Sequence, residues 1–587
     1  PAGLTGVAHA QVAKVPAKWD KTVEFLIVGT GFAGLAAAIE GHEQGLKDIL
    51  VIDKMPSYGG NSIITGGAVA AAGTDMQKAA GIKDNPDLLF ADIVKAGGGL
   101  AHPDLARHIA DSSVENYHWL KKVGVQFKAV TFHGGHSVPR SHAVHNNSGS
   151  GFIIPMYKKC QEYGIPVQLR TIVDELVVDP ETGAVLGVKA RRNYRFGREK
   201  SGQVYYIRAT KGVLLAAGGF SQNVQMRMEH DPRLNEKFGS TNHPGATGEA
   251  LQAAQMIGAN TIQMDWIQLG PWTSPDENGF GLAPLFVEPA VGYGLMIDPA
   301  TGKRFIQETG NRKVRADAIV AIGHPTLIYV SEKNAQNKII GKNMTPELFE
   351  RAVKNGVVKK VANLKELADT YKVPYEELKK TNEKFDSYIK AQKDPDFNCM
   401  MFKDAVPNGD GPYYVCRLWP RVHHCMGGLV INNKAQVENA RGKVIPGLYA
   451  AGEITGGVHG MVRLGTVAVA DCIIFGLYPT VLLDHAMRQR NTAFLTELAV
   501  PLTFQHYAYD ALFEEAIPET DLSRYRTLFA AGVAGTYDTT LPALEKFVKE
   551  GGTLVLSGTA MDRNEYGVPI RNPLSEGIAF RTRADGK

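Results

Sequence analysis

A chain of 587 residues is too long for one hydrophobic core, and we expect two to four domains. A formal charge of +4 over this length does not indicate a nucleic-acid or acidic-membrane partner. No stretch reaches the roughly 20 apolar residues that a membrane-spanning helix needs.

The first ten residues, PAGLTGVAHA, have the character of the end of an export signal. They are small and apolar and close in Ala8-His9-Ala10, an A-x-A pattern of the kind that signal peptidase cleaves. We expect residues 1–20 to be either the remnant of such a signal, for instance of the Tat type, or a flexible tail. The first alternative predicts a periplasmic or otherwise exported protein.

Residues 23–53 carry the strongest motif. Phe25 to Val28 predict a strand, Gly29 to Gly34 (GTGFAG) have the spacing G-x-G-x-x-G, and Leu35 to Glu43 predict a helix. The free N–H groups at the start of such a helix, with the positive end of its dipole, suit a pyrophosphate.

Each glycine of this motif has its own purpose. Gly29 permits the tight turn, Gly31 lets the backbone touch the phosphate, and Gly34 lets helix and strand pack closely. A second strand, Ile49 to Ile52, ends in Asp53, about 20 residues on, where a carboxylate accepts hydrogen bonds from a ribose. We therefore predict a dinucleotide site.

Residues 54–73, KMPSYGGNSIITGGAVAAAG, are rich in glycine and small side chains. Beside a dinucleotide fold, such a stretch would flank the pyrophosphate and an attached ring system. The alternative is a mobile glycine loop. The candidate contacts are Gly59-Gly60-Asn61-Ser62 and Gly66-Gly67.

Residues 80–127 predict helices, and residues 133–151, HGGHSVPRSHAVHNNSGSG, predict a loop rich in glycine and histidine. The spacing of its histidines matches no zinc signature, so we expect no metal site here. These histidines are His133, His136, His142 and His145.

Three β-like runs, Thr171–Val177, Val185–Arg191 and Val204–Arg208, predict a small sheet inserted in the nucleotide domain. A further strand, Gly212–Ala217, ends in Ala217-Gly218-Gly219-Phe220, which returns the chain to the cofactor.

Six motifs in this order resemble the flavoprotein of the fumarate reductase and succinate dehydrogenase superfamily. Its most similar branch is the soluble, exported one of flavocytochrome c fumarate reductases and urocanate reductase. The resemblance covers about residues 20–480. The motifs are the opening fingerprint, the loop at Gly59 to Ser62, LLAAGGF ending at Phe220, TNHPGATGEA at 241–250, VHHCMGGLVIN at 422–432 and PGLYAAGEITGGVHGMVRLG at 446–465.

The resemblance implies an α/β fold: a Rossmann-like FAD-binding domain with an inserted α+β capping domain, and non-covalent FAD. Glu453 would hydrogen-bond FAD, and Val467 to Phe475 would form the last helix, with Thr466-Val467 replacing the usual small polar residues near the isoalloxazine. The expected FAD contacts are Gly29, Gly31, Phe32, Ala33, Gly34, Asp53, Lys54, Gly59, Gly60, Asn61, Ser62, Gly66, Gly67, Val173, Ala217, Gly218, Gly219, Asn242, Gly248, His423, Gly452, Glu453, Arg463, Thr466, Val467 and Ala468.

Reducing an enoate needs a hydride donor such as N5 of reduced flavin, cations that hold the carboxylate, and a proton donor on the opposite side. His424 and Arg463 fall on the family's carboxylate-clamping positions, and a planar guanidinium suits a carboxylate. Arg312 matches the proton-donating arginine, and Glu288 matches the glutamate that would reprotonate it. The alternative for Arg312 is a surface ion pair.

Two positions depart from the fumarate reductase pattern. Gly270 stands where those proteins carry a histidine, and Val291 stands where they carry an arginine three residues after the glutamate. Because the family uses both groups for the second carboxylate and the proton relay, we expect a monocarboxylate with an apolar or aromatic substituent. Candidates for an apolar pocket wall, or simply for the core of the capping domain, are Trp266, Trp272 and Tyr293.

Residues 344–388 predict a solvated helical region. Residues 510–587 predict strand, helix, glycine turn and strand, which resembles a piece of a small amidotransferase-like α/β module of accessory or oligomerising role. The expected domains are an FAD-binding domain at 21–241 and 397–480, a capping domain at 242–396 and a C-terminal α/β extension at 481–587.

We therefore expect an FAD-dependent oxidoreductase that reduces the C=C bond of an acrylate, cinnamate or urocanate type of substrate in anaerobic respiration. The alternatives are a ketosteroid-type FAD dehydrogenase, a fumarate reductase or a flavin electron carrier. The sequence has no C-x-x-C-H haem signature and no cysteine cluster for an iron–sulfur centre. Its electron donor is therefore expected to be a separate multihaem c-type cytochrome or FMN protein, and not nicotinamide.

Overall fold

The computed structural model describes residues 14–133, 135–342, 344–482, 522–530, 535–536, 540–556 and 563–564. The chain forms two compact units, Pro1–Pro479 and Thr480–Lys587. The A-x-A pattern at residues 8–10 lies outside the described residues. Within the described ranges, no helix combines the length and apolar character that a membrane crossing requires.

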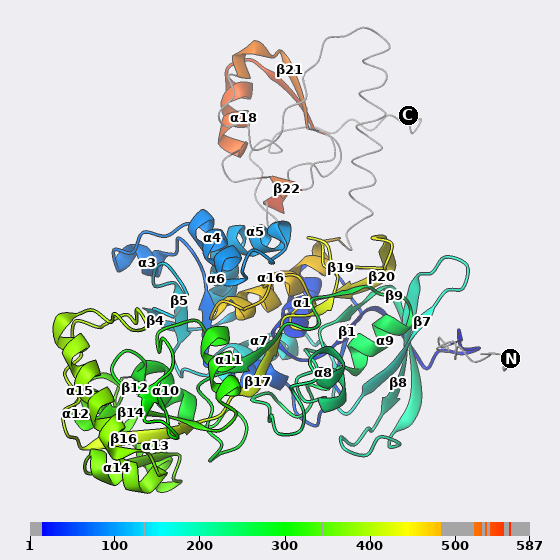
Figure 1. Ribbon diagram of the computed structural model, residues 1–587. Helices are drawn as coiled ribbons and strands as arrows, with labels where there is room; N and C mark the ends of the chain where they lie inside the picture. Colours follow the sequence, from blue (N-terminus) through cyan, green and yellow to red (C-terminus); the bar gives the residue numbers. More distant parts are fainter. Residues whose placement is uncertain are drawn as a thin grey trace, which may run out of the picture. The chain divides into compact units, whose positions relative to one another are not determined.

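An eight-stranded sheet forms the nucleotide-binding part of the first unit (Figure 1). Strands β1 (Lys21–Val28), β2 (Ile49–Ile52), β9 (Gln203–Leu215) and β20 (Val444–Ala450) are parallel neighbours. All of β2 and the last four residues of β1 are buried, as expected for parallel strands covered on both faces. The other strands of this sheet are β6 (Val167–Gln168), β7 (Ile172–Val178), β8 (Val185–Arg192) and β19 (Gln436–Glu438).

The prediction of a separate small sheet after residue 171 is wrong, because β7 and β8 continue the main sheet through β9. The runs expected as two strands, Val204–Arg208 and Gly212–Ala217, are one strand, β9. Gly212 allows this continuity: its φ of +148° favours glycine, and it lies where the pairing with β1 shifts register between Val23 and Phe25.

Two further groups of elements surround this sheet. A three-stranded sheet, β3-β5-β4, contains β5, which begins inside the expected histidine-rich loop. The strands are β3 (Ala68–Ala70), β4 (Phe127–Thr131) and β5 (Ser141–Val144), and the helices are α1 (Phe32–Glu43), α2 (Gly60–Ile63), α3 (Asp75–Ala79), α4 (Pro86–Ala96), α5 (Pro103–Asp111), α6 (Ser113–Val123), α7 (Ser150–Glu162), α8 (Val224–His230), α9 (Glu249–Met256) and α16 (Val467–Leu482).

A second sheet has five antiparallel strands in the order β13-β12-β14-β16-β15. It lies mostly in the range expected for the capping domain, and we call it and its helices the capping part. Alternate residues of β14 enter two apolar cores: Ile328 packs with Trp272, and Leu327 packs with Phe385. Its elements are α10 (Ala283–Ala290), β12 (Leu295–Asp298), β13 (Lys303–Arg304), α11 (Arg312–Ile322), β14 (Thr326–Ser331), α12 (Glu332–Lys338), α13 (Pro346–Lys354), β15 (Val358–Val361), α14 (Leu364–Tyr371), α15 (Tyr375–Ala391) and β16 (Tyr413–Leu418).

Two features of the capping sheet differ from the sequence expectation. The expected helical region 344–388 is interrupted by β15, whose ends are buried against β16. Strand β16 also continues the sheet past residue 396, and we propose that the second boundary of the capping domain lies near residue 420.

A two-stranded ladder joins the capping and nucleotide-binding parts. Strand β11 (Ile267–Gly270) runs antiparallel to β17 (Arg421–Cys425) and places Gln268 opposite His424. The chain enters the capping part after β11 and returns from it at β17. Strands β10 (Thr261–Ile262) and β18 (Gly428–Leu429) form a second, shorter pair.

In the second unit, the described residues form parallel strands with a helix between them in sequence. They are β21 (Thr527–Ala530), α18 (Thr540–Lys549) and β23 (Thr553–Leu556), which matches the expected order of strand, helix and strand. A short pair, β22 (Gly535–Thr536) and β24 (Arg563–Asn564), is also parallel.

Candidate active site

A cavity lies at the carboxyl ends of β1, β2 and β9, the usual ligand site of an α/β sheet. The expected FAD contacts that line it are Gly29, Gly31, Phe32, Ala33, Asp53, Lys54, Gly60, Asn61, Ser62, Val173, Ala217, Gly218, Gly248, Gly452 and Glu453.

The geometry of this cavity fits a dinucleotide. A Cβ on Gly29 would lie 2.2 Å from the carbonyl oxygen of Ala216, and a Cβ on Gly34 would lie 1.9 Å from the carbonyl oxygen of Gly29. Helix α1 starts at the cavity without a side-chain cap at Gly31, so its positive end can face a phosphate.

The carboxylate of Asp53 is fixed at the end of β2. Its Oδ2 accepts hydrogen bonds from the N–H (3.0 Å) and hydroxyl (2.5 Å) of Thr30, and its Oδ1 accepts one from Met55 N–H (2.9 Å). Lys54 Nζ forms an ion pair of 2.5 Å with Glu249. Lys54 therefore brings little free charge to the cavity.

The other expected FAD contacts do not line this cavity. Gly34 allows the close packing just described, and Gly67 faces Ser148, whose backbone nitrogen would lie 2.3 Å from an added Cβ. Outside the cavity lining are Gly34, Gly59, Gly66, Gly67, Gly219, Asn242, His423, Arg463, Thr466, Val467 and Ala468. Lining residues not predicted from the sequence include Thr30, Thr171, Ala216, His243, Glu249 and Cys472, some of which directly adjoin predicted contacts.

Glu453 connects the cavity to β17. It lines the cavity, its Oε1 accepts a hydrogen bond from Cys425 N–H (2.9 Å), and it lies 3.5 Å from Nδ1 of His424. Burial raises the pKa of Glu453 to about 7. The carboxyl group is thus poised to carry or lack a proton beside the cofactor cavity.

His423 faces a different set of residues from its neighbour, because side chains alternate along a strand. Its Nδ1 lies 2.7 Å from the hydroxyl of Thr241. Its ring is nearly perpendicular to that of Trp272, with the ring centroids 5.1 Å apart. Burial, followed by the positive charges of Arg463 and Arg312, holds the pKa of His423 well below its usual value. This imidazole is therefore neutral.

His424 faces Glu453 and contacts the ring of His459 at 5.6 Å. Burial is the main cause that lowers its pKa, with Arg463 next. His423 thus contacts Thr241 and Trp272, and His424 contacts Glu453, while the charges of Arg463 and Arg312 act on both imidazoles. The role expected of His424 at the carboxylate stays a prediction.

Arg463 is a buried cation, and at least one of its hydrogen-bond donors has no partner among the described residues. Only 9 % of the residue is exposed, its Nη2 donates to Gln268 at 3.4 Å, and its Nε has no partner among the described residues. Burial, with a further contribution from Arg312, lowers its pKa to about 9. An anionic ligand would satisfy this group.

Arg312 begins α11 and lies over the ring of Trp272, with 4.4 Å between Cζ and the ring centroid. Its Nε is 3.9 Å from Glu288, which also contacts Nη2 of Arg315 at 3.3 Å. Burial lowers the pKa of Arg312, and Glu288 partly offsets this. Burial opposes ionisation of Glu288, but Arg315 and then Arg312 hold its pKa below the usual value.

Arg315 was missed by the sequence analysis. Arg315 follows Arg312 by three residues, about one helical turn, in α11. This spacing is the sequence signal that could have identified it. Val291, where an arginine was expected from the family pattern, packs against the apolar core of the capping part. The second arginine beside Glu288 therefore comes from α11.

The structure brings Trp272 to the site but not the other two expected aromatic residues. Trp266 lines a second cavity with Lys313, whose Nζ lies 5.6 Å from the ring centroid. Tyr293 stacks on Phe402 at 5.0 Å. At Gly270, an added Cβ would lie 3.3 Å from the Trp272 ring, so the absence of a side chain makes room for the indole.

The model of the FAD binding domain family matches residues 24–469. The chain belongs to this family. The chain is similar to the acrylate reductase flavoprotein subunit of Shewanella woodyi, which is 41% identical over 469 residues that cover 78% of this chain and 91% of that protein. The urocanate reductase of Eggerthella lenta is 35% identical over 474 residues, covering 79% of this chain and 75% of that protein.

Among solved structures, this FAD-binding chain is similar to the open conformation of a flavocytochrome c3 fumarate reductase, with a TM-score of 0.66 and 30% identity over 80% of this chain and 79% of that one. The expected family, the Rossmann-like α/β fold and FAD as cofactor are confirmed.

Proposed function

We propose that this flavoprotein reduces the C=C bond of an α,β-unsaturated monocarboxylate. The observation that carries the proposal is the grouping of His423, Arg463 and Arg312 near the FAD cavity, because it joins an anion site to a proton donor. The similar proteins named as acrylate reductase and urocanate reductase support the same chemistry.

The carboxylate is held by Arg463 with help from a neutral histidine. The unpartnered Nε of Arg463 supplies a charged donor in a buried place, where a hydrogen bond to an anion is strong. We assign the neutral donor to His423, which faces Trp272, and we assign His424 to the cofactor side with Glu453.

Reduced FAD, when bound, supplies a hydride for the β-carbon of the enoate. Arg312 donates the proton to the α-carbon, and its lowered pKa makes the guanidinium a stronger acid than a free arginine. Glu288, held between Arg312 and Arg315, is placed to return a proton to Arg312. One hydride and one proton together saturate the double bond.

A substrate panel tests the proposal. We expect the purified holoenzyme to oxidise reduced methyl viologen with acrylate, methacrylate, cinnamate or urocanate, and to show a higher kcat/KM with one of these than with fumarate. The reason is that a second carboxylate would meet Gly270, which has no side chain, and Val291, which packs in an apolar core, and an unpaired buried charge is strongly unfavourable. Fumarate as the best substrate would contradict the assignment.

Arg463→Ala is expected to raise the KM for the enoate by about 10- to 100-fold, because a charge-assisted hydrogen bond is lost. FAD content, measured by flavin absorbance, should remain normal because Arg463 does not line the cavity. Arg441→Ala, at an exposed position of the same part, provides the matched control and should leave KM unchanged.

Two alternatives are disfavoured by specific observations. A ketosteroid-type dehydrogenase has no need of the buried, partly unsatisfied Arg463. A flavin electron carrier has no need of the Arg312, Glu288 and Arg315 cluster. Absence of viologen oxidation across the whole enoate panel would favour the carrier.

We further propose that the enzyme works in anaerobic respiration, that it is exported, and that a separate multihaem cytochrome or FMN protein reduces it. The donor assignment is supported by the single complete dinucleotide fingerprint, which we assign to FAD, and by the absence of a C-x-x-C-H pattern from the given sequence. Rapid turnover of the purified chain with NADH alone would contradict the donor assignment.

A further inference from the structure

The loop that follows β4 carries a histidine that the mechanism above does not use. His133 lies beside Gly465, two residues from Arg463: a Cβ on Gly465 would be 3.4 Å from the His133 Cβ. The charges of Arg312, Glu288 and Arg463 all act on its imidazole. His133 therefore lies at the substrate site, near both the carboxylate clamp and the proton donor.

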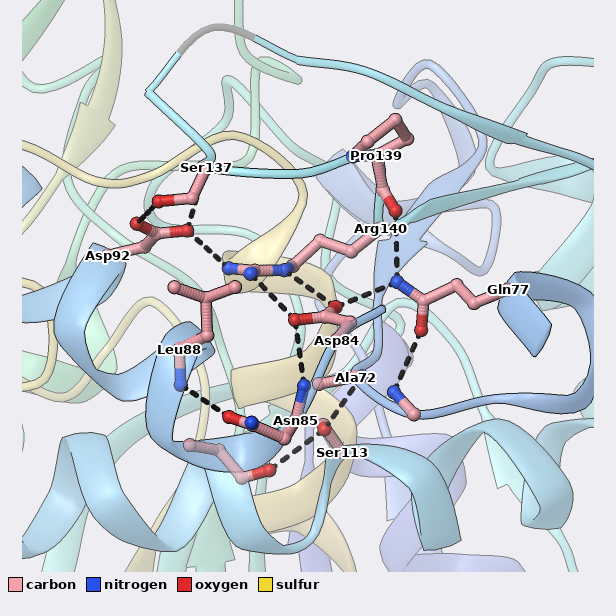
Figure 2. Close-up of polar contacts among 12 residues, drawn as sticks. Ala72, Gln77, Asp84, Asn85, Leu88, Asp92, Ser113, Ser137, Pro139 and Arg140 are labelled. Carbon is pink, nitrogen blue, oxygen red and sulfur yellow. Dashed lines mark hydrogen bonds and ion pairs between the residues drawn. The ribbon is translucent and has the colours of Figure 1, made fainter. Parts of the chain in front are cut away.

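The loop is held in this place by two sets of contacts. His136, three residues on, has its Nε2 2.7 Å from the carbonyl oxygen of Gly465. Arg140 then forms ion pairs with two buried carboxylates, Asp84 (2.8 Å) and Asp92 (2.6 Å), as Figure 2 shows. Asp92 also accepts a hydrogen bond from the backbone N–H of Ser137 at 2.8 Å.

The hydrogen-bonding state of the His133 ring follows from its surroundings. Its Nδ1 is buried and has no partner among the described residues. Burial, with Arg312 next in effect, lowers the pKa of His133 to about 4, so the ring is neutral and carries one N–H. Placing that N–H on Nδ1 would bury an unsatisfied donor, so the proton belongs on Nε2.

We propose that His133 binds the substrate and that its Nε2–H donates a hydrogen bond to the carboxylate of the enoate. The reacting α-carbon bears this carboxylate and is protonated by Arg312, so a residue near both Arg312 and Arg463 faces the carboxylate end. The inference rests on the proposed function and adds a third donor, supplied by a loop of the nucleotide-binding part, to Arg463 and His423.

Three variants of His133 test which nitrogen acts. His133→Ala removes the donor and should weaken acrylate binding to the oxidised holoenzyme by about tenfold or more, measured by titration calorimetry. His133→Gln places an amide N–H near the Nε2 position and should bind within about threefold of wild type. His133→Asn places it near Nδ1 and should behave like His133→Ala.

Further readouts separate a binding role from a structural or catalytic one. In the viologen assay, kcat of the three variants should stay within about threefold of wild type while KM follows the binding constants. FAD content and Tm should be unchanged. Should His133→Ala fail to fold, the contrast between His133→Gln and His133→Asn still decides the question.

The outcomes distinguish this inference from the proposed function. Wild-type turnover of an enoate with unchanged binding in His133→Ala, or rescue by Asn but not by Gln, would overturn the inference alone. A wild-type holoenzyme that neither binds nor reduces any carboxylate of the panel would overturn both.

Discussion

Arg312→Ala should lower kcat with the best enoate by about 10²- to 10⁴-fold, the range that a positioned general acid contributes. The physical reason is the loss of the proton donor that lies over Trp272 with Glu288 behind it. Arg312 does not line the FAD cavity, so the variant should retain FAD. Steady-state oxidation of reduced viologen gives kcat, and flavin absorbance gives the FAD content.

Two comparisons make the Arg312 result specific. Arg351→Ala removes an exposed arginine of the same capping part and should leave kcat unchanged. Glu288→Gln keeps Arg312 but removes the carboxylate between it and Arg315, so it should slow turnover less than Arg312→Ala. Near-normal kcat in Arg312→Ala would show that another group protonates the substrate.

The nucleotide-binding motif could be predicted from the sequence because its parts are local. The strand, the glycines, helix α1 and Asp53 occupy 33 consecutive residues, and each residue type follows from the backbone that it must permit or the group that it must hold. The pairing of Arg312 with Glu288 was also expected, but from family resemblance.

Contacts between distant segments could not be predicted in this way. Gln268 meets Arg463 across 195 positions of sequence, and nothing in either segment encodes the partner. His423 and His424 have different surroundings because neighbouring side chains of β17 point to opposite faces of the ladder, and the fold decides what lies on each face. Arg315 contacts Glu288 from helix α11, whereas the family pattern pointed to position 291, which is a valine here.

Arg140→Met should be among the most destabilising single changes in the described part of the chain. The Arg140 side chain and that of Asp84 are fully buried, and Asp92 is nearly so. Figure 2 shows the guanidinium between these two carboxylates, with Gln77 also donating to Asp84 at 2.7 Å. Removing one partner of a buried ion pair typically destabilises by about 3–5 kcal/mol.

The matched control is Arg107→Met, another arginine that pairs with two aspartates. Here the side chains of Arg107 and Asp87 are 38% and 85% exposed, and exposed pairs contribute only about 0–1 kcal/mol. Thermal unfolding of both holoenzymes should therefore show a much lower Tm for Arg140→Met. Equal Tm values would contradict a stabilising role for the buried cluster.

The sign of the effect can be checked by neutralising the carboxylates as well. In the triple variant Arg140→Met, Asp84→Asn, Asp92→Asn, no buried charge is left without a partner, so part of the lost Tm should return. Because the same cluster anchors the loop of His133, Arg140→Met should also weaken acrylate binding beyond what lower stability explains, at a temperature where the protein remains folded. Destabilisation without weaker binding would mean that the contacts of His136 alone hold the loop in place.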